Sequence, residues 1–224
     1  MKILAVSDTE VPMLYSPLLV QRFRDVDMII SCGDLPYYYL EYMVSMLDVP
    51  LYYVRGNHAN KVESTTGGDR SSPLGAIDIH KHCKCDYSGL LLAGIEGSIR
   101  YNYGPQQYTQ GEMWSMVWLL TPAFFLNRLR HGRYLDVFVT HAPPWKIHDA
   151  EDRPHQGIKA FRWVINTFKP RYHLHGHIHL YRQDAVKDTM VGRTHVVNTY
   201  GYQVLEINEK SLTPPPKSSR LDLD

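Results

Sequence analysis

The stretch "DMIISCGDLP", residues 27–36, places a short apolar run directly before a polar turn. The run is short for a helix and is bounded by Gly33, so it predicts a buried strand that ends at Asp34. Four other segments repeat this arrangement, which indicates a sheet built from similar strands. They are "KILAVS" (2–7) before Asp8, "LYYVR" (51–55) before Gly56-Asn57-His58, "YLDVFV" (134–139) before Thr140-His141, and "YHLH" (172–175) before Gly176-His177.

Helices are expected between these strands. One begins at Ser16-Pro17, where serine suits the N-cap and proline the first helical position, and others cover 37–47, 111–130 and 157–168. Strands that alternate with helices predict an α/β protein with a largely parallel sheet. The segments "AIDIH", "LLLAGIEG", "RTHVVNT" and "YQVLEI" supply enough further strands for a second sheet, whereas residues 59–75 are predicted to form a long loop.

Length and composition favour one globular domain. The 224 residues, 44% hydrophobic and 21% charged, predict a domain over 1–208 and a flexible Pro/Ser-rich tail over 209–224. A net charge of +1 with no long basic run argues against a broad nucleic-acid surface. Three cysteines without framework spacing, and no apolar stretch long enough to cross a bilayer, favour a cytoplasmic protein without a membrane span. The oligomeric state is not predicted.

Polar residues follow the carboxyl ends of all five expected strands. They are Asp8, Asp34, Asn57-His58, His141 and His177/His179. Parallel strands end at a common edge, so these side chains are expected to share one cleft. Aspartate, asparagine and histidine are ligands that suit Mn, Fe or Zn. Two such ions bridged by a carboxylate form a centre suited to displacement at a phosphate ester.

The order of these motifs resembles that of the calcineurin-like metallophosphoesterase superfamily. The motifs are "SDTE" (7–10), "CGDLP" (32–36), "RGNHA" (55–59), "THAPP" (140–144) and "HGHIH" (175–179). Each motif is weak alone, but the five together, in this order and at strand ends, are specific. The resemblance implies a four-layer α/β/β/α sandwich, with two mixed sheets flanked by helices and a dinuclear metal site at the carboxyl edge of the strands.

The resemblance also implies roles for individual residues. Asp34 would bridge two divalent metals, of which manganese is favoured and Fe, Zn or Mg are alternatives. Asp8 and His179 would bind the first metal, and the second would be bound by Asn57, His141 and His177. A hydroxide activated by both metals would attack the phosphate ester while His58 protonates the leaving oxygen. The implied function is a metal-dependent phosphohydrolase, with a phosphodiesterase preferred; its partner would be a small phosphate ester or an exposed phosphate group.

Two positions depart from the family pattern. Glu10 stands where the family has histidine, and a carboxylate there favours Mn²⁺ or Mg²⁺ if it is a ligand of the first metal. The alternative is that Glu10 faces solvent. Ala59 stands where an acid usually follows the Gly-Asn-His motif, so Asp149 or Asp152 would have to orient His58 instead. These departures keep a non-catalytic scaffold open as an alternative function, beside a nucleotide or protein phosphomonoesterase.

Substrate-binding residues are expected in the loops near this edge. Arg100 could hold a phosphate with two hydrogen bonds, and the loop after His141 offers His148, Asp152 and His155. His173 and His175 lie on the strand itself and are expected to have structural or orienting roles. A separate zinc cluster in "HKHCKCD" (80–86) is disfavoured because its spacing matches no closed site.

Overall fold

Two mixed β-sheets form the centre of the protein. The computed structural model describes residues 1–58, 62–65, 68–181 and 185–207. The first sheet has the order β15-β1-β2-β3-β6, formed by Gly201–Glu206, Lys2–Ser7, Met28–Ser31, Leu51–Tyr53 and Ala76–Asp78. The second has the order β13-β14-β12-β11-β8-β7, formed by Asp188–Val191, Thr194–Asn198, Tyr172–His175, Val137–Thr140, Leu91–Ile95 and Cys83–Cys85. Only β15, β13 and β7 pair antiparallel to their neighbours in these sheets.

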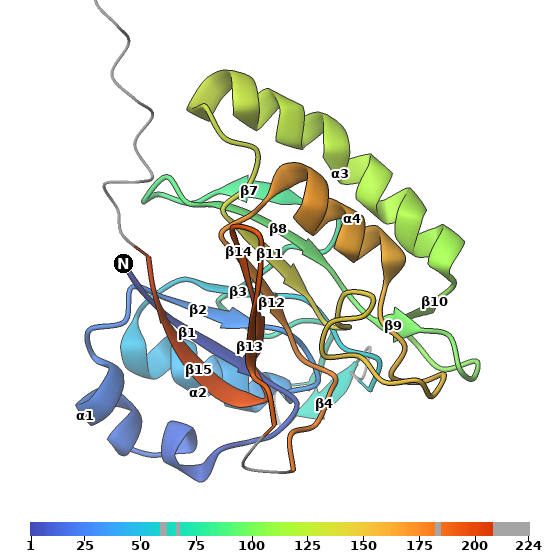
Figure 1. Ribbon diagram of the computed structural model, residues 1–224. Coiled ribbons are helices and arrows are strands. Elements are labelled where there is room, and N and C mark those ends of the chain that lie inside the picture. The colour runs from blue at the N-terminus through green and yellow to red at the C-terminus, as the bar shows by residue number, and fades with distance from the viewer. Residues whose placement is uncertain (59–61, 66–67, 182–184, 208–224) are drawn as a thin grey trace, which may run out of the picture.

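Helices cover the outer face of each sheet, so the protein has four layers (Figure 1). The 3₁₀ helix η1 (Pro12–Tyr15), α1 (Leu18–Phe23) and α2 (Tyr37–Leu47) pack against the first sheet. Helices α3 (Gln110–His131) and α4 (Lys159–Phe168) pack against the second. Between the sheets lies a third apolar core, in which Ile30 and Val54 face Leu92 and Val139. The expected α/β/β/α sandwich is confirmed.

Alternate residues of β2 explain this layering. Ile30 lies in the core between the sheets, whereas Ile29 packs with the helices on the other face, because successive side chains in a strand point to opposite sides. Both faces are apolar and fully buried. The sequence of such a strand is a continuous hydrophobic run, which is typical of sheets covered on both faces.

The segment 59–75 is not a simple loop. Residues Glu63–Thr65 (β4) and Gly68–Arg70 (β5) form a short antiparallel pair within it. The Gly and Ser content that predicted a loop is common to tight hairpins, so composition did not separate the two. A further small parallel pair joins β9 (Ser98–Ile99) and β10 (Gln107–Tyr108). The predicted tail over 209–224 lies outside the described residues.

Helix α3 is the longest helix and carries clear end signals. Thr109 accepts the backbone N–H of Glu112, whose carboxylate accepts the N–H of Thr109 in return, a capping box. Gly132 ends the helix with a positive φ of 74°. Within the described part of the chain, neither α3 nor any other helix has the length and apolarity needed to cross a bilayer.

Candidate metal centre

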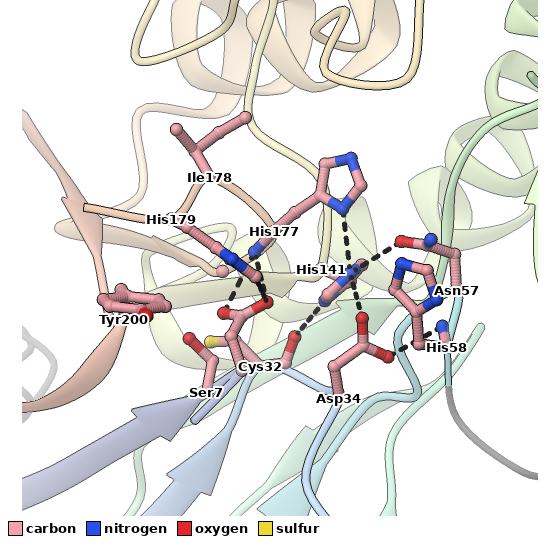
Figure 2. A network of polar contacts seen from close by, with 12 residues as sticks. Ser7, Cys32, Asp34, Asn57, His58, His141, His177, Ile178, His179 and Tyr200 are labelled. Carbon is pink, nitrogen blue, oxygen red and sulfur yellow. Dashed lines mark hydrogen bonds and ion pairs between the residues drawn. The ribbon is translucent and has the colours of Figure 1, made fainter. Parts of the chain in front are cut away.

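Polar atoms from three other segments lie around Nε2 of His141 at the carboxyl edge of the sheets (Figure 2). Nε2 of His141, after β11, lies 3.2 Å from Oδ2 of Asp34, which follows β2. The same nitrogen lies 3.0 Å from Oδ1 of Asn57, after β3, and 3.2 Å from Nδ1 of His177, after β12. The structure therefore brings these four strand-end residues together.

Backbone carbonyls fix the orientation of both imidazoles. Nδ1 of His141 donates to the carbonyl oxygen of Cys32 at 2.8 Å, and Nε2 of His177 donates to that of Pro154 at 2.8 Å. A carbonyl only accepts, so each of these nitrogens carries the hydrogen. Nε2 of His141 and Nδ1 of His177 therefore face each other. Each ring is oriented by a hydrogen bond from its other nitrogen, as is typical of histidines that bind metals.

Asp8 contacts the backbone of His177, and His179 lies beside Asp8. Both carboxylate oxygens of Asp8 accept the backbone N–H of His177, at 2.9 and 3.1 Å. Nε2 of His179 is 3.9 Å from Oδ1 of Asp8, and its Nδ1 is 2.7 Å from the hydroxyl of Tyr181. His179 also packs against the ring of Tyr200, at 5.0 Å between centroids. Its side chain is 42% exposed, whereas that of Asp8 is 1% exposed.

The backbone at this edge is strained. Asp8, Asp34 and His177 have positive φ angles of 64°, 56° and 68°. Non-glycine residues rarely adopt this conformation, and such residues concentrate at functional sites. The positive φ angles turn the backbone sharply just after each strand, so the side chains of these three residues project over the edge of the sheet.

Glycines allow these turns to pack closely. A Cβ on Gly33 would lie 2.5 Å from the backbone nitrogen of Gly56, and one on Gly56 would lie 2.0 Å from Oδ1 of Asp34. A Cβ on Gly176 would lie 2.4 Å from Oδ2 of Asp8. Each position therefore has room for a hydrogen atom only, so the glycines bring the polar side chains together.

The site is a buried group of opposite charges. Burial opposes ionisation of Asp34, but the charge of His141 and the hydrogen bonds from His141 and the His58 backbone outweigh it and hold the pKa of Asp34 at about 2. Burial would lower the pKa of His141, but the negative charges of Asp34 and Asp8 raise that pKa to about 9. Burial raises the pKa of Asp8 and lowers the pKa of His177 to about 3.

These residues fit a divalent cation. Among the described residues, Asp8, Asp34 and His141 form a group whose ligand atoms all lie within 4.8 Å of one another. Two buried carboxylates face one imidazolium, whose Nε2 proton sits between oxygen acceptors of Asp34 and Asn57. A metal ion at that point would replace the proton and supply more positive charge to the carboxylates. Mixed nitrogen and oxygen donors suit Mn, Fe or Zn.

Glu10 contacts Tyr38 and not the residues around His141. Its carboxylate accepts the hydroxyl of Tyr38 at 2.5 Å, and this contact raises the pKa of Tyr38 to about 12. Glu10 is exposed and does not belong to the group of ligand atoms around His141. Its role as a ligand of the first metal stays a prediction. Metal content measured in Glu10→Ala tests it directly: loss of one of two ions would show that Glu10 is a ligand.

The four expected substrate-binding residues lie in two places. His155 packs against His177, with ring centroids 5.4 Å apart, and bonds Asp152 at 2.6 Å. Arg100 lies near them, but its guanidinium bonds both oxygens of Glu112, at 3.0 and 3.1 Å. His148 is behind the centre, where it bonds His175 and Thr189, so it is not brought together with the metal-binding candidates.

The expected partner for His58 is not found among the described residues. Asp149 accepts backbone N–H groups of Lys146 and Gly157 and so shapes its own loop, and Asp152 is bonded to His155. Ala59 lies outside the described residues. The His58 backbone N–H donates to Oδ1 of Asp34 at 2.9 Å, which ties this exposed residue to the centre.

A cavity opens beside the metal-binding candidates. It has a volume of about 570 Å³. Tyr101 in its wall accepts a hydrogen bond from Nδ2 of Asn57 at 3.1 Å, and Arg153, which also lines it, precedes Pro154, whose carbonyl holds His177. The remaining lining is mostly neutral and polar. It comprises Ile99, Arg100, Asn102, Tyr103, Tyr108, Thr109, Gln110 and Gln156.

Three contacts at the centre were not foreseen from the sequence. Tyr101 holds the amide of Asn57, and the carbonyls of Cys32 and Pro154 hold the two imidazoles. Carbonyl contacts leave no signal in residue type, because every residue has that group. Tyr101 follows a predicted strand in the same way as the other polar residues, and that position could have indicated it.

His173 and His175 have the structural roles expected of them. His173 is fully buried and bonds Thr140 at 2.8 Å, and His175 bonds His148 at 2.9 Å. Burial lowers the pKa of both imidazoles, which keeps them neutral. Cys32 is likewise a core residue, since it is fully buried between the sheets. This burial raises the pKa of its thiol to about 12.

A family match and a solved structure agree with this fold. Residues 1–181 match the calcineurin-like phosphoesterase family. TT1561 of Thermus thermophilus has a similar crystal structure, with a TM-score of 0.62, 17% identity, and coverage of 95% of this chain and 96% of that one. The phosphopantetheinyl hydrolase PptH from Mycobacterium tuberculosis has 13% identity, a TM-score of 0.48, and coverage of 89% and 88%. No curated protein matches significantly. The chain belongs to the calcineurin-like phosphoesterase family.

Proposed function

We propose that the protein is a two-metal phosphodiesterase. The observation that carries this proposal is that Oδ2 of Asp34, Oδ1 of Asn57 and Nδ1 of His177 all lie within 3.2 Å of Nε2 of His141. These donors would hold one metal, and Asp8, Asp34 and His179 would hold the other, with Glu10 as a further candidate ligand. When bound, two such metals supply an activated water and neutralise charge on the phosphate.

His58 is the proposed general acid. Its backbone is held by Asp34, while its side chain is exposed at the edge of the site and so accessible to a phosphate ester. An imidazole at this position can hydrogen-bond a phosphoryl oxygen and transfer a proton to the leaving oxygen. Asp34 positions His58 as well as binding metal, which couples the two parts of the site.

The cavity beside Asn57 supports a diester over a monoester. A diester carries two organic groups, so a site needs room for the group that stays on the phosphate as well as the leaving group. The cavity of about 570 Å³ offers that room and is lined mainly by amides, hydroxyls and aromatic rings. One of its two arginines, Arg100, is already bonded to Glu112, so the lining offers little charge for a monoester dianion.

Hydrolysis assays test this proposal. Purified protein loaded with Mn²⁺ is expected to cleave bis-nitrophenyl phosphate faster than nitrophenyl phosphate, and His58→Ala is expected to lose most of this activity while keeping its metals. Faster cleavage of the monoester would favour a phosphomonoesterase. Absence of turnover with bound Mn²⁺, Fe²⁺, Zn²⁺ or Mg²⁺ on both substrates would favour a non-catalytic scaffold.

The two metals are expected to bind with different affinities. The donors around His141 are buried and fixed by carbonyls, whereas His179 is 42% exposed and bonds Tyr181 through its other nitrogen. A preorganised set loses less entropy on binding. Titration of metal-free protein with Mn²⁺ should show two steps, and His179→Ala should remove only the weaker one. Loss of the tighter step in that variant would contradict the assignment.

Tyr101→Phe is expected to weaken metal binding or hydrolysis by about 10- to 100-fold, the usual effect of losing a group that orients a ligand. The change removes the hydroxyl that accepts a hydrogen bond from Nδ2 of Asn57. Without this bond the amide can rotate, and its oxygen can turn away from the proposed metal. Tyr103→Phe is the matched control, because Tyr103 lines the same cavity and is fully exposed. Equal effects of the two changes would show that the Asn57 contact has no orienting role.

A further inference from the structure

One face of helix α3 exposes an unusual number of large apolar side chains. The opposite face packs into the core through residues such as Met116, Leu120 and Phe124. The outward face exposes 63% of Leu119, 52% of Phe125 and 84% of Leu129, together with much of Trp118 and Leu126. Between Glu112 and Arg128 the helix contains no charged residue. A surface helix normally carries charged residues on its solvent side, so this face is suited to a partner.

The exposed residues follow a heptad spacing. Ser115, Pro122 and Leu129 are seven residues apart and exposed, and two pairs, 118/119 and 125/126, lie between them. Apolar residues alternating at intervals of three and four form the seam by which one helix packs against another. The seam extends for about 21 Å along α3 at 1.5 Å per residue. Its natural partner is therefore another helix with a similar seam.

Aromatic packing holds part of this seam rigid. Trp118 lies 5.0 Å from Trp163 of α4 and 6.1 Å from Trp114, measured between ring centroids. Phe125 makes edge contacts with Tyr134 and Phe168, at 5.6 and 6.0 Å. Large side chains that are already ordered lose little entropy on association, which is typical of interface anchors.

We propose that this seam is the interface of a homodimer in which the two α3 helices pack antiparallel about a two-fold axis at Pro122. In that arrangement Leu119 meets the partner's Phe125 and Trp118 meets the partner's Leu126. A two-fold interface requires such a self-complementary surface. The charges agree, because Glu112 near one end of the helix approaches the basic end, Arg128 and Arg130, of the other copy. A parallel pair would place like charges together.

Sedimentation of the full chain over a hundredfold concentration range tests this proposal. Wild type should shift from monomer to dimer mass, and Leu119→Glu or Phe125→Lys should each weaken association by about tenfold or more. An equal mixture of these two variants should associate again, because the new glutamate meets the new lysine across the two-fold axis. Leu74→Glu is the matched control, since Leu74 is 59% exposed outside this face. It should leave association unchanged.

Crosslinking tests the antiparallel geometry. In a Cys85→Ser background, Pro122→Cys should form a disulfide-linked dimer, because the two copies of residue 122 meet on the axis. Ser115→Cys should not, because the two copies of residue 115 would lie about 21 Å apart along the helices. Crosslinking of both variants would indicate a parallel pair and overturn the proposal.

The same measurements distinguish the dimer from other partners of this face of α3. A wild type that stays monomeric throughout, or whose association is unchanged in Leu119→Glu, would overturn the dimer. Monomeric wild type that binds phosphatidylglycerol vesicles through this face would do the same and assign the face to a lipid surface. All these measurements are made on protein without added metal and need no hydrolysis. Their outcome is therefore independent of whether the protein is a phosphodiesterase.

Discussion

Asp34→Asn is expected to reduce hydrolysis of the diester by about a thousandfold, or ~4 kcal/mol of transition-state stabilisation. Asp34 lies 3.2 Å from His141 and accepts the backbone N–H of His58 at 2.9 Å, so one side chain serves the proposed metals and the proposed acid. Asparagine keeps the shape but loses the charge that attracts both metals. Steady-state rates with Mn²⁺, together with metal content by elemental analysis, measure the effect.

Asp25→Asn is the control for this prediction. Asp25 is an exposed aspartate paired with Lys2 at the surface, so its replacement should leave both activity and metal content unchanged. The unfolding midpoint of Asp34→Asn, measured in parallel, separates lost chemistry from lost structure. A folded Asp34→Asn protein with near wild-type rates would rule out Asp34 as the bridging ligand.

Gly33→Ala is expected to lower the free energy of unfolding by about 2–5 kcal/mol, because about 1–3 kcal/mol for overpacking adds to about 1–2 kcal/mol for the positive φ. Gly33 has a φ of 101°, and a Cβ there would lie 2.5 Å from the nitrogen of Gly56 and 2.9 Å from the carbonyl carbon of Arg55. These are backbone atoms at the end of β3, so they cannot rotate away. Chemical denaturation of the metal-free protein measures the change without a contribution from ligand binding.

Gly89→Ala separates the clash from the cost of a positive φ. Gly89 has a φ of 85°, but nothing lies within 4 Å of the position of its Cβ. It should therefore lose only about 1–2 kcal/mol, the cost of the left-handed conformation for a residue with a side chain. If the two substitutions cost the same, the close approach of Gly33 to Gly56 does not contribute to stability.

The architecture could be predicted because it follows from local patterns. Short apolar runs such as 28–31 and 137–140 are buried on both faces, and strands of this kind need helices on each side. Helix α2 has the predicted bounds of 37–47, since its apolar residues face one side and Pro36 precedes it. The antiparallel pair β4–β5 was missed because Gly-rich composition does not distinguish a loop from short paired strands.

The positions of individual site residues were harder to predict. The sequence predicted Glu10 as a candidate metal ligand and His148 as a substrate-binding residue. His148 bonds His175 away from the metal-binding candidates, whereas Glu10 bonds Tyr38 and its role as a ligand stays a prediction. The rotation of a side chain depends on neighbours distant in sequence, here 28 and 27 residues away. Periodicity carries no information on such pairs.

The sequence by itself determined the order of strands and helices, the polar residues at the strand ends, and the family to which those motifs belong. Only the tertiary structure decided which nitrogen of His141 and His177 faces the centre, because carbonyls of Cys32 and Pro154 hold the other nitrogen of each. It also decided that Gly33 and Gly56 must lack side chains, since two strand ends meet there at contact distance. Local propensity sets the elements, whereas orientation at the site depends on contacts that exist only after the sheets have packed.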